Sequence, residues 1–135
     1  IYGNTDQGGL GDLIESVSVK ELNQVNISED EMAILRQGFY QVVNGNGQFN
    51  TGSAIGQGAS VTISAKTGTA ETYTTTPSGE VVTAVNTNVV AYAPSDNPQI
   101  AVSVVLPNLT NQSSMTTKTI MREIINLYQS MYPMN

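Results

Sequence analysis

The sequence predicts a mixed α/β (α+β) fold, in which an antiparallel sheet carries helices on its faces. Three observations support this class. One stretch opens with a helix-capping pattern and continues with apolar residues at helical spacing, several runs have the composition and alternation of strands, and the C-terminal stretch returns to helical spacing. The predicted order is helix, strand, extended arm, strand, strand and helix, within one unit that has no internal repeat.

The N-terminal residues show the weakest pattern. The first twelve, IYGNTDQGGLGD, contain four glycines and predict a loop, in which Ile1 and Tyr2 would be the end of a strand that begins upstream. Residues 13–24 are compatible with a short helix. The first strong element follows them.

A helix is predicted over residues 29–44. Ser28 and Glu31 match a capping box, in which the serine side chain accepts from an amide of the first turn and the glutamate reaches back to the serine amide. Asn44-Gly45 would end the helix in a left-handed turn. Five apolar residues share one helical face and predict that it packs on the core: Met32, Leu35, Phe39, Val42 and Val43.

Residues 45–66 should form a surface loop and then a strand. The segment 45–58 is rich in glycine and asparagine and predicts a loop, held down by Phe49 and Ile55. Apolar and polar residues then alternate over 61–66, which predicts a strand with one buried face. Lys66 falls on its polar side.

Two long strands and a helix are predicted beyond this point. Residues 72–80 should form an exposed hairpin arm that returns at 81–85, and the runs 88–93 and 99–106 should form an antiparallel hairpin around a proline-rich turn. The run 99–106 offers apolar or small side chains to both faces, which predicts a central strand. A C-terminal helix should pack on the sheet through Ile120, Ile124, Leu127, Tyr128 and Met131.

Composition excludes several classes of function. The net charge is −6, and the five cations are scattered rather than clustered, so we expect no nucleic-acid partner. The chain has no cysteine and no histidine, which removes thiol nucleophiles, disulfides, imidazole bases and Cys/His metal sites. We therefore expect no cofactor and no metal, and any catalytic base must be Lys, Asp, Glu or Tyr.

The tripeptide Lys66-Thr67-Gly68 is the candidate functional motif. A lysine at the end of an edge strand is most often simply solvated, and the tripeptide alone is a weak signal. It is, however, the third signature of serine β-lactamases and penicillin-binding proteins. A peptide carboxylate would need a fixed cation and hydroxyl donors, which Lys66, Thr67 and Thr69 supply on one short segment, with the two threonines on one side of the strand.

A wider resemblance surrounds this motif. The strand SAKTGTAE, the hairpin NTNVVAYAPSDNPQIAVSVVLPN, the helix SEDEMAILRQGFYQVV and the closing IINLYQSMYPMN together resemble the C-terminal part of the transpeptidase domain of class B penicillin-binding proteins. The resemblance implies acyl transfer between peptidoglycan stem peptides through a serine ester, with β-lactam antibiotics as mimics of the D-alanyl-D-alanine end. It also implies an extracytoplasmic protein, anchored in the cell membrane by an N-terminal helix outside this chain.

The same resemblance assigns site residues. Lys66, Thr67, Gly68 and Thr69 would bind substrate, Lys66 and the backbone amide of Thr69 would be catalytic, and that amide would belong to the oxyanion hole. Gly68 would let the substrate backbone lie close to the strand. The sequence contains no Ser-x-x-Lys motif for the nucleophile, because Ser16 and Ser114 have their lysines four residues on.

Residues 1–135 therefore read as an incomplete domain whose N-terminal strands, helical subdomain and nucleophile lie elsewhere. Unpaired amides along so apolar a strand as 99–106 would make the isolated chain an unstable monomer. The sequence Ser95-Asp96-Asn97 spells a catalytic motif of some β-lactamases, but it follows Lys66 and sits between two prolines, so it predicts a turn. Two other functions stay open: a non-catalytic extracellular binding module, and a β-lactamase or β-lactam sensor of the same fold.

Overall fold

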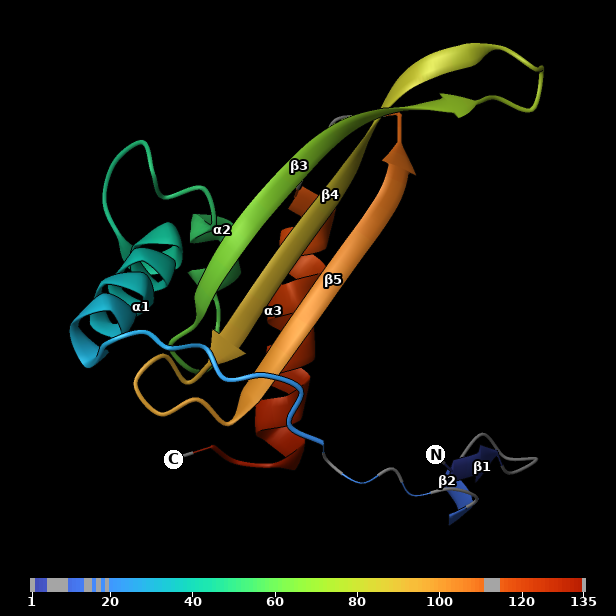
Figure 1. The fold of residues 1–135 in the computed structure, drawn as a ribbon. Helices are drawn as coiled ribbons and strands as arrows, with labels where there is room; N and C mark the ends of the chain where they lie inside the picture. The colour runs from blue at the N-terminus through green and yellow to red at the C-terminus, as the bar shows by residue number, and fades with distance from the viewer. Residues whose placement is uncertain are drawn as a thin grey trace.

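The computed structural model describes residues 2–4, 10–13, 16, 18, 20–110 and 115–134. Its main body is a three-stranded antiparallel sheet in the order β3-β4-β5, with helix α3 across one face and helix α1 beside β3 (Figure 1). The strands are β3 (Ser64–Thr75), β4 (Val81–Ala93) and β5 (Ile100–Leu109). This arrangement confirms the predicted mixed fold.

The N-terminal residues contain two short strands that were not predicted and lack a helix that was. Strands β1 (Tyr2–Asn4) and β2 (Leu10–Leu13) form an antiparallel pair where a loop was expected. The helix expected over 13–24 is wrong where the structure describes this span, because Leu13 belongs to β2 and residues 16, 18 and 20–28 adopt no regular structure. Residues 14, 15, 17 and 19 lie outside the described residues. Leu22 and Val25 are 86% and 78% exposed, so no packed face supports a short helix there.

Helix α1 (Glu29–Asn44) has the predicted bounds and the predicted cap. The Glu31 amide donates to Ser28 Oγ at 3.3 Å, and the Ser28 amide donates to Glu31 Oε2 at 2.8 Å. The hydrogen bond from the Ser28 amide, followed by the bond from its hydroxyl, lowers the pKa of Glu31 below its ordinary value. These reciprocal bonds fix where the helix starts.

The apolar face predicted for α1 is mostly not core. Val43 is the helix residue that is buried, and Leu35 remains 48% exposed. The predicted left-handed end is also wrong, because Gly45 is extended at φ −75° and ψ −179°. A Cβ at Gly45 would lie 2.6 Å from the Gln41 carbonyl oxygen, so close backbone approach explains the glycine instead.

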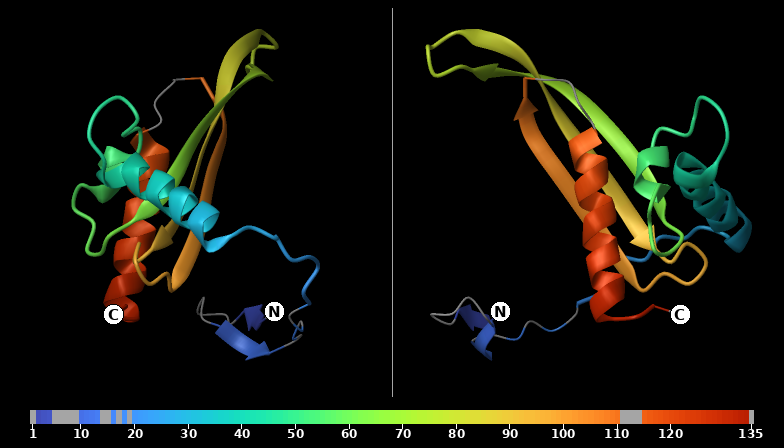
Figure 2. Two further views of the ribbon diagram at one scale, coloured as in Figure 1. Left: turned by 60° about the vertical axis from the view of Figure 1, so that its left-hand side comes forward. Right: turned by 180° about the vertical axis from the view of Figure 1, so that it is seen from behind.

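The first two strands of the sheet are longer than predicted. β3 runs without a break through the motif, and β3 and β4 together form an arm that extends past the end of β5 (Figures 1 and 2). At the start of β3 the predicted alternation of buried and exposed side chains is absent, because Ser64 is as buried as its neighbours Ile63 and Ala65. Contact with α1 at this end covers the face that the sequence pattern assigned to water.

β5 pairs antiparallel with β4, as predicted for this hairpin. It is, however, an edge of the three-stranded sheet rather than a central strand. Val105, which points to the face away from α3, is 57% exposed. Among the described strands, β5 therefore has β4 as its one neighbour, and the prediction of a central strand is not met there.

Helix α3 (Met115–Met131) packs on the sheet, through a stripe that is offset from the one predicted (Figure 2, right). Ile120 and Tyr128 of the predicted face are partly buried against the core. The buried residues of the helix are Thr117, Met121 and Ile125, whereas Leu127 and Met131 are 61% and 60% exposed. Apolar residues occupy more than one face of this helix, so spacing alone does not identify the packed face.

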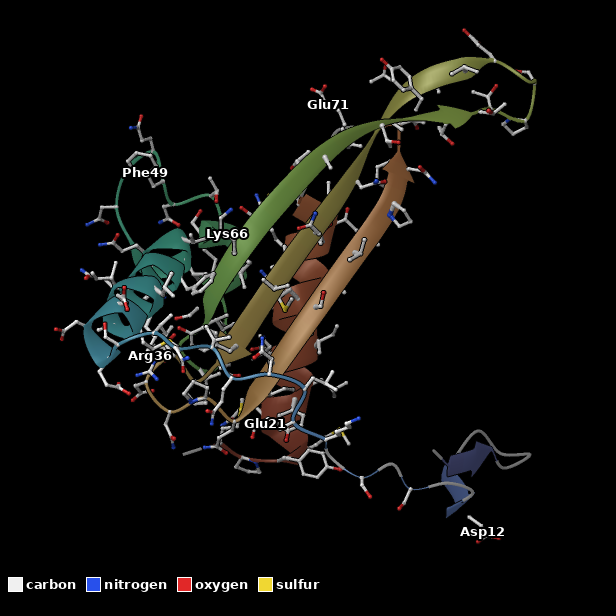
Figure 3. All side chains as sticks on the ribbon, viewed as in Figure 1. Asp12, Glu21, Arg36, Phe49, Lys66 and Glu71 are labelled. Atoms are coloured by element: carbon white, nitrogen blue, oxygen red, sulfur yellow. The ribbon has the colours of Figure 1, made fainter. Side chains whose placement is uncertain are left out.

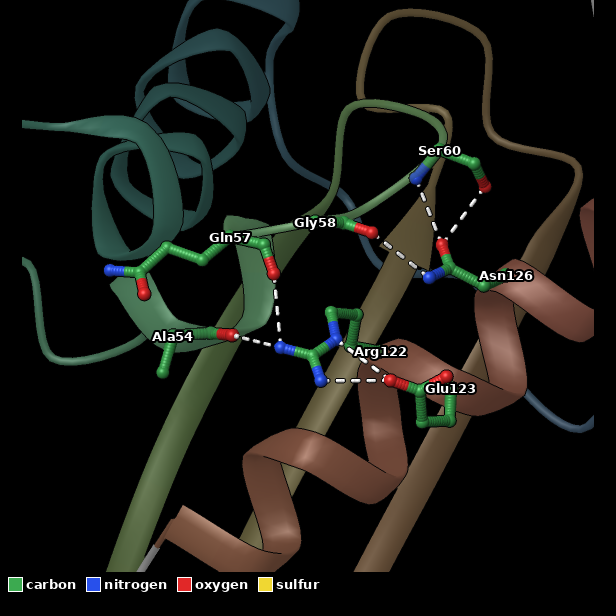
Figure 4. A network of polar contacts seen from close by, with 7 residues as sticks. All are labelled: Ala54, Gln57, Gly58, Ser60, Arg122, Glu123 and Asn126. Carbon is green, nitrogen blue, oxygen red and sulfur yellow. Dashed lines mark hydrogen bonds and ion pairs between the residues drawn. The ribbon is translucent and has the colours of Figure 1, made fainter.

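The predicted loop 45–58 contains a short helix, α2 (Ser53–Gly56). Ile55 is fully buried, as expected, whereas Phe49 is 75% exposed and does not hold the loop down. Arg122 of α3 donates to the carbonyl oxygens of Ala54 and Gln57 at 3.4 and 3.0 Å, which attaches α2 to α3 (Figure 4). The core joins all three helices to the sheet and consists of Val43, Ile55, Ile63, Ala65, Val89, Ala91, Ala93, Val104, Met121, Ile125 and Met134.

Candidate active site at the free edge of the sheet

The Lys-Thr-Gly motif lies on β3, whose outer edge pairs with no other described strand. Its residues pair across to β4 in the register Thr67↔Val89, Gly68↔Asn88 and Thr69↔Thr87. The sequence prediction that the motif lies on a strand is therefore confirmed, and its position is at an exposed edge that an extended peptide can reach.

The three side chains proposed to grip a carboxylate are divided between two faces. Thr67 and Thr69 share a face with Val89 and Thr87, which are 2% and 1% exposed, and this face lies against α3. Lys66 alternates to the opposite face, where it is exposed (Figure 3). The two threonines come together as predicted, and the lysine side chain leaves the strand on the other side.

Two hydrogen bonds show which backbone groups point outward from β3. The Ile63 carbonyl accepts from Asn44 Nδ2 at 2.9 Å, and the Thr67 carbonyl accepts from Lys66 Nζ at 2.6 Å. Backbone groups of a strand alternate between its two edges, so residues an even number apart share an edge. The amide of Thr69 is thereby directed to the same free edge as the carbonyl of Thr67.

A polar pocket of about 330 Å³ opens between this part of β3 and the first turns of α3. Thr67, Gly68 and Thr69 line it from β3, while Thr117 and Lys118 line it from α3. Thr51, from the loop before α2, completes one wall. The pocket presents hydroxyl groups and one ammonium, which is the chemistry that binds an anion.

Hydroxyl pairs fix part of this lining. Thr51 Oγ1 and Thr67 Oγ1 are 2.7 Å apart, and the buried hydroxyls of Thr87 and Thr117 also bond to each other. The hydroxyl of Thr69 makes no hydrogen bond to any described residue. It is therefore available to a ligand that reaches the edge of β3.

The structure gives a reason for glycine at position 68 that the sequence did not suggest. A Cβ at this position would lie 2.3 Å from Asn88 Oδ1, because the Asn88 side chain crosses over the glycine from β4. The absent side chain thus makes room for a neighbouring strand residue on the face opposite α3. Whether substrate also approaches there stays a prediction.

Sequence reasoning missed Lys118 and Asn88. In the sequence analysis, Lys118 was considered only as a lysine at the wrong spacing from Ser114. Asn88 was considered only as part of a predicted strand. The separation of about fifty residues between Thr67 and Lys118 carries no local pattern, so only the packing of α3 on the sheet brings them together. The turn predicted at Ser95-Asp96-Asn97 is confirmed by its place between β4 and β5.

Comparisons with known proteins agree with this arrangement. The family described as penicillin binding protein transpeptidase domain matches residues 3–126. Penicillin-binding protein 2B of Streptococcus pneumoniae is 57% identical over 135 residues, which are 100% of this chain and 19% of that protein. Penicillin-binding protein 2A of Bacillus subtilis is 37% identical over 127 residues, covering 89% of this chain and 17% of that protein.

Solved structures give the same result. One structure of penicillin-binding protein 2B from Streptococcus pneumoniae superposes with a TM-score of 0.77 at 57% identity, covering 99% of this chain and 21% of that chain. A second, from another strain, superposes with a TM-score of 0.70 at 51% identity, covering 99% and 20%. The chain spans about a fifth of the length of these relatives.

The antiparallel sheet, its flanking helices and the Lys-Thr-Gly edge match part of the transpeptidase structure of penicillin-binding protein 2B. The chain belongs to the penicillin-binding protein transpeptidase family. The resemblance seen in the sequence is confirmed. Among the described residues, no helix combines the length and the apolar character needed to cross a bilayer.

Proposed function

We propose that this chain supplies the Lys-Thr-Gly strand of a peptidoglycan D,D-transpeptidase. Lys66, Thr67, Gly68 and Thr69 bind the donor stem peptide, and the Thr69 amide is one donor of the oxyanion hole. The observation that carries this proposal is the free edge of β3, where an outward amide lies beside a polar pocket lined by Thr67 and Thr69. Membership of the transpeptidase family supports it.

The chemistry needs this arrangement. A serine oxygen attacks the carbonyl carbon of the penultimate D-alanine, the bond to the terminal D-alanine breaks, and that residue leaves with a proton on its amine. An amine of a second stem peptide then displaces the serine from the ester. Both steps place negative charge on the carbonyl oxygen, and losing one donor to such an oxyanion costs about 3 kcal/mol of barrier.

The proposal assigns the nucleophile to other segments of a longer protein. The sheet face opposite α3 has an apolar groove of about 330 Å³, lined by Phe39, Val90 and Tyr92 among others. Val90 is 48% exposed there, and β5 offers an unpaired edge. We infer that strands and a helical subdomain from the N-terminal part of the domain cover these surfaces and bring a serine to the edge of β3.

Location and partners follow from the proposed reaction. Peptidoglycan lies outside the cell membrane, so the complete protein would work on the outer side, held by an N-terminal anchor. Its partners would be stem peptides and β-lactam antibiotics, with no nucleic acid. The net charge of −6 fits this last point, because the phosphate backbone repels an acidic protein.

Acylation of the whole protein by a labelled β-lactam tests the proposal. We expect a stable adduct on the complete protein, none on this chain alone, and an acylation rate about 100-fold lower for Lys66→Ala. Lys20→Ala, which removes an equally exposed cation far from the motif, should match the unaltered protein. An unchanged rate for Lys66→Ala would favour a non-catalytic binding module, and rapid loss of the adduct would identify a β-lactamase.

A further inference from the structure

Lys118 is the cationic residue that lines the polar pocket together with Thr67 and Thr69. It belongs to the first turns of α3 and is half-buried. Lys66 does not line this pocket and lies on the other face of β3. The cation that lines the same pocket as the two motif hydroxyls thus lies about fifty residues further along the chain.

Lys118 has no counter-ion in the part of the chain that the structure describes. The one ion pair there joins Arg122 to Glu123 at 2.8 Å, and the side chain of Lys118 makes no hydrogen bond to a described residue. Lys66, by contrast, donates to the Thr67 carbonyl at 2.6 Å. A half-buried ammonium among hydroxyls, without a carboxylate beside it, is suited to receive an anion from outside.

The hydroxyls around Lys118 are arranged to donate as well. Thr51 Oγ1 lies 2.7 Å from Thr67 Oγ1, and when Thr51 donates in this bond the Thr67 proton is left for a ligand. The Thr69 hydroxyl has no described partner. An anion in the pocket could therefore accept from both threonines while it faces the ammonium.

We propose that Lys118 binds the terminal carboxylate of the acyl donor and the corresponding carboxylate of a β-lactam. This inference rests on the proposed transpeptidase function and adds a second cation, on α3, to the substrate-binding residues Lys66, Thr67 and Thr69. The Lys66 side chain starts from the opposite face of β3, and its ammonium donates to the Thr67 carbonyl at the free edge.

The experiment compares a β-lactam with a free carboxylate and its methyl ester on the whole protein. Lys118→Met keeps the length of the side chain and removes the charge. We expect the second-order acylation rate with the free acid to fall about tenfold, and the rate with the ester to stay within about twofold of that of the unaltered protein. Lys118→Arg should retain most of the rate with the acid.

Lys20→Met is the matched control, because it removes one positive charge from an exposed site outside the pocket. It should leave both rates unchanged. Equal losses for acid and ester in Lys118→Met, or no loss for the acid, would overturn the proposal. Failure of the proposed function gives a different result, since the unaltered protein would then not be acylated by either compound.

Discussion

The motif Lys66-Thr67-Gly68 divides its chemistry among two faces and one edge of a single strand. Thr67 presents a hydroxyl to the pocket under α3, Lys66 turns its ammonium to the Thr67 carbonyl, and the Thr69 amide points out of the sheet. Alternation of side chains makes this division unavoidable in a regular strand. A carboxylate in the pocket would also meet a cation from another element, because Lys118 of α3 lines the same pocket.

Gly68 on β3 leaves room for the side chain of Asn88 on β4. Gly68→Ala should lower the stability of the transpeptidase domain by about 1–2 kcal/mol, because the new Cβ displaces the Asn88 side chain. Asn88→Ala removes the obstacle, so the double variant should recover most of the loss in urea denaturation. Additive losses in the double variant would contradict this explanation and return Gly68 to a role in substrate approach.

Sequence reasoning identified the motif residues because they are contiguous and match a known signature. It placed Thr67 and Thr69 on one side correctly, since strand alternation is a local property. It missed Lys118 and Asn88 because each reaches the site through a tertiary contact. No spacing in the sequence relates a lysine in the C-terminal helix to a strand fifty residues earlier.

Among the elements, helix α1 shows what local pattern determines and what it leaves open. Its bounds agree with the prediction, because Ser28 and Glu31 satisfy each other at the start through short-range bonds. Its buried face does not agree, because burial depends on what packs against the helix, and only Val43 reaches the core of this chain. The same reason explains the offset between the predicted and observed faces of α3.

The stability of the first turn of α1 should depend on pH, because the capping box contains the carboxylate of Glu31. Bonds from Ser28 lower the folded-state pKa of Glu31 below the ordinary 4.5, so their stabilisation is complete above that pH and is lost as the pH falls through the folded-state value. The rate of backbone amide hydrogen exchange at residues 28–32, corrected for intrinsic rates, should therefore increase as the pH is lowered from about 6 to about 3. Glu31→Gln should show no such change, and a pH-independent exchange in the unaltered protein would contradict the assignment.

Arg122 is the residue that attaches α2 to α3. Arg122→Met keeps the aliphatic stem but removes the donors to the Ala54 and Gln57 carbonyls, so we expect a loss of about 1–2 kcal/mol in the unfolding free energy of the domain. Glu123→Gln is the control, because Glu123 is 61% exposed and its ion pair with Arg122 contributes little. Equal losses in the two variants would show that the ion pair, rather than the carbonyl contacts, carries the stability.

On the scale of the whole molecule, the sheet and helices leave apolar surface that the described residues do not cover. Ile34 is 70% exposed on α1, and Val105 is 57% exposed on β5. The sequence predicted a second partner for β5 from the composition of the strand, and the described sheet places β5 at an edge. A second neighbour for β5, outside the described strands, stays part of the proposal, because no pattern within the sequence can specify it.

We propose that the free edge of β3 forms one wall of an acyl-transfer site. A crystal structure of the whole protein acylated by a β-lactam would show whether it does. We expect the ester carbonyl oxygen about 2.7–3.1 Å from the Thr69 amide nitrogen, with the carboxylate of the drug in the pocket of Thr67, Thr69 and Lys118. An acyl group bound away from β3, with this pocket empty, would contradict it.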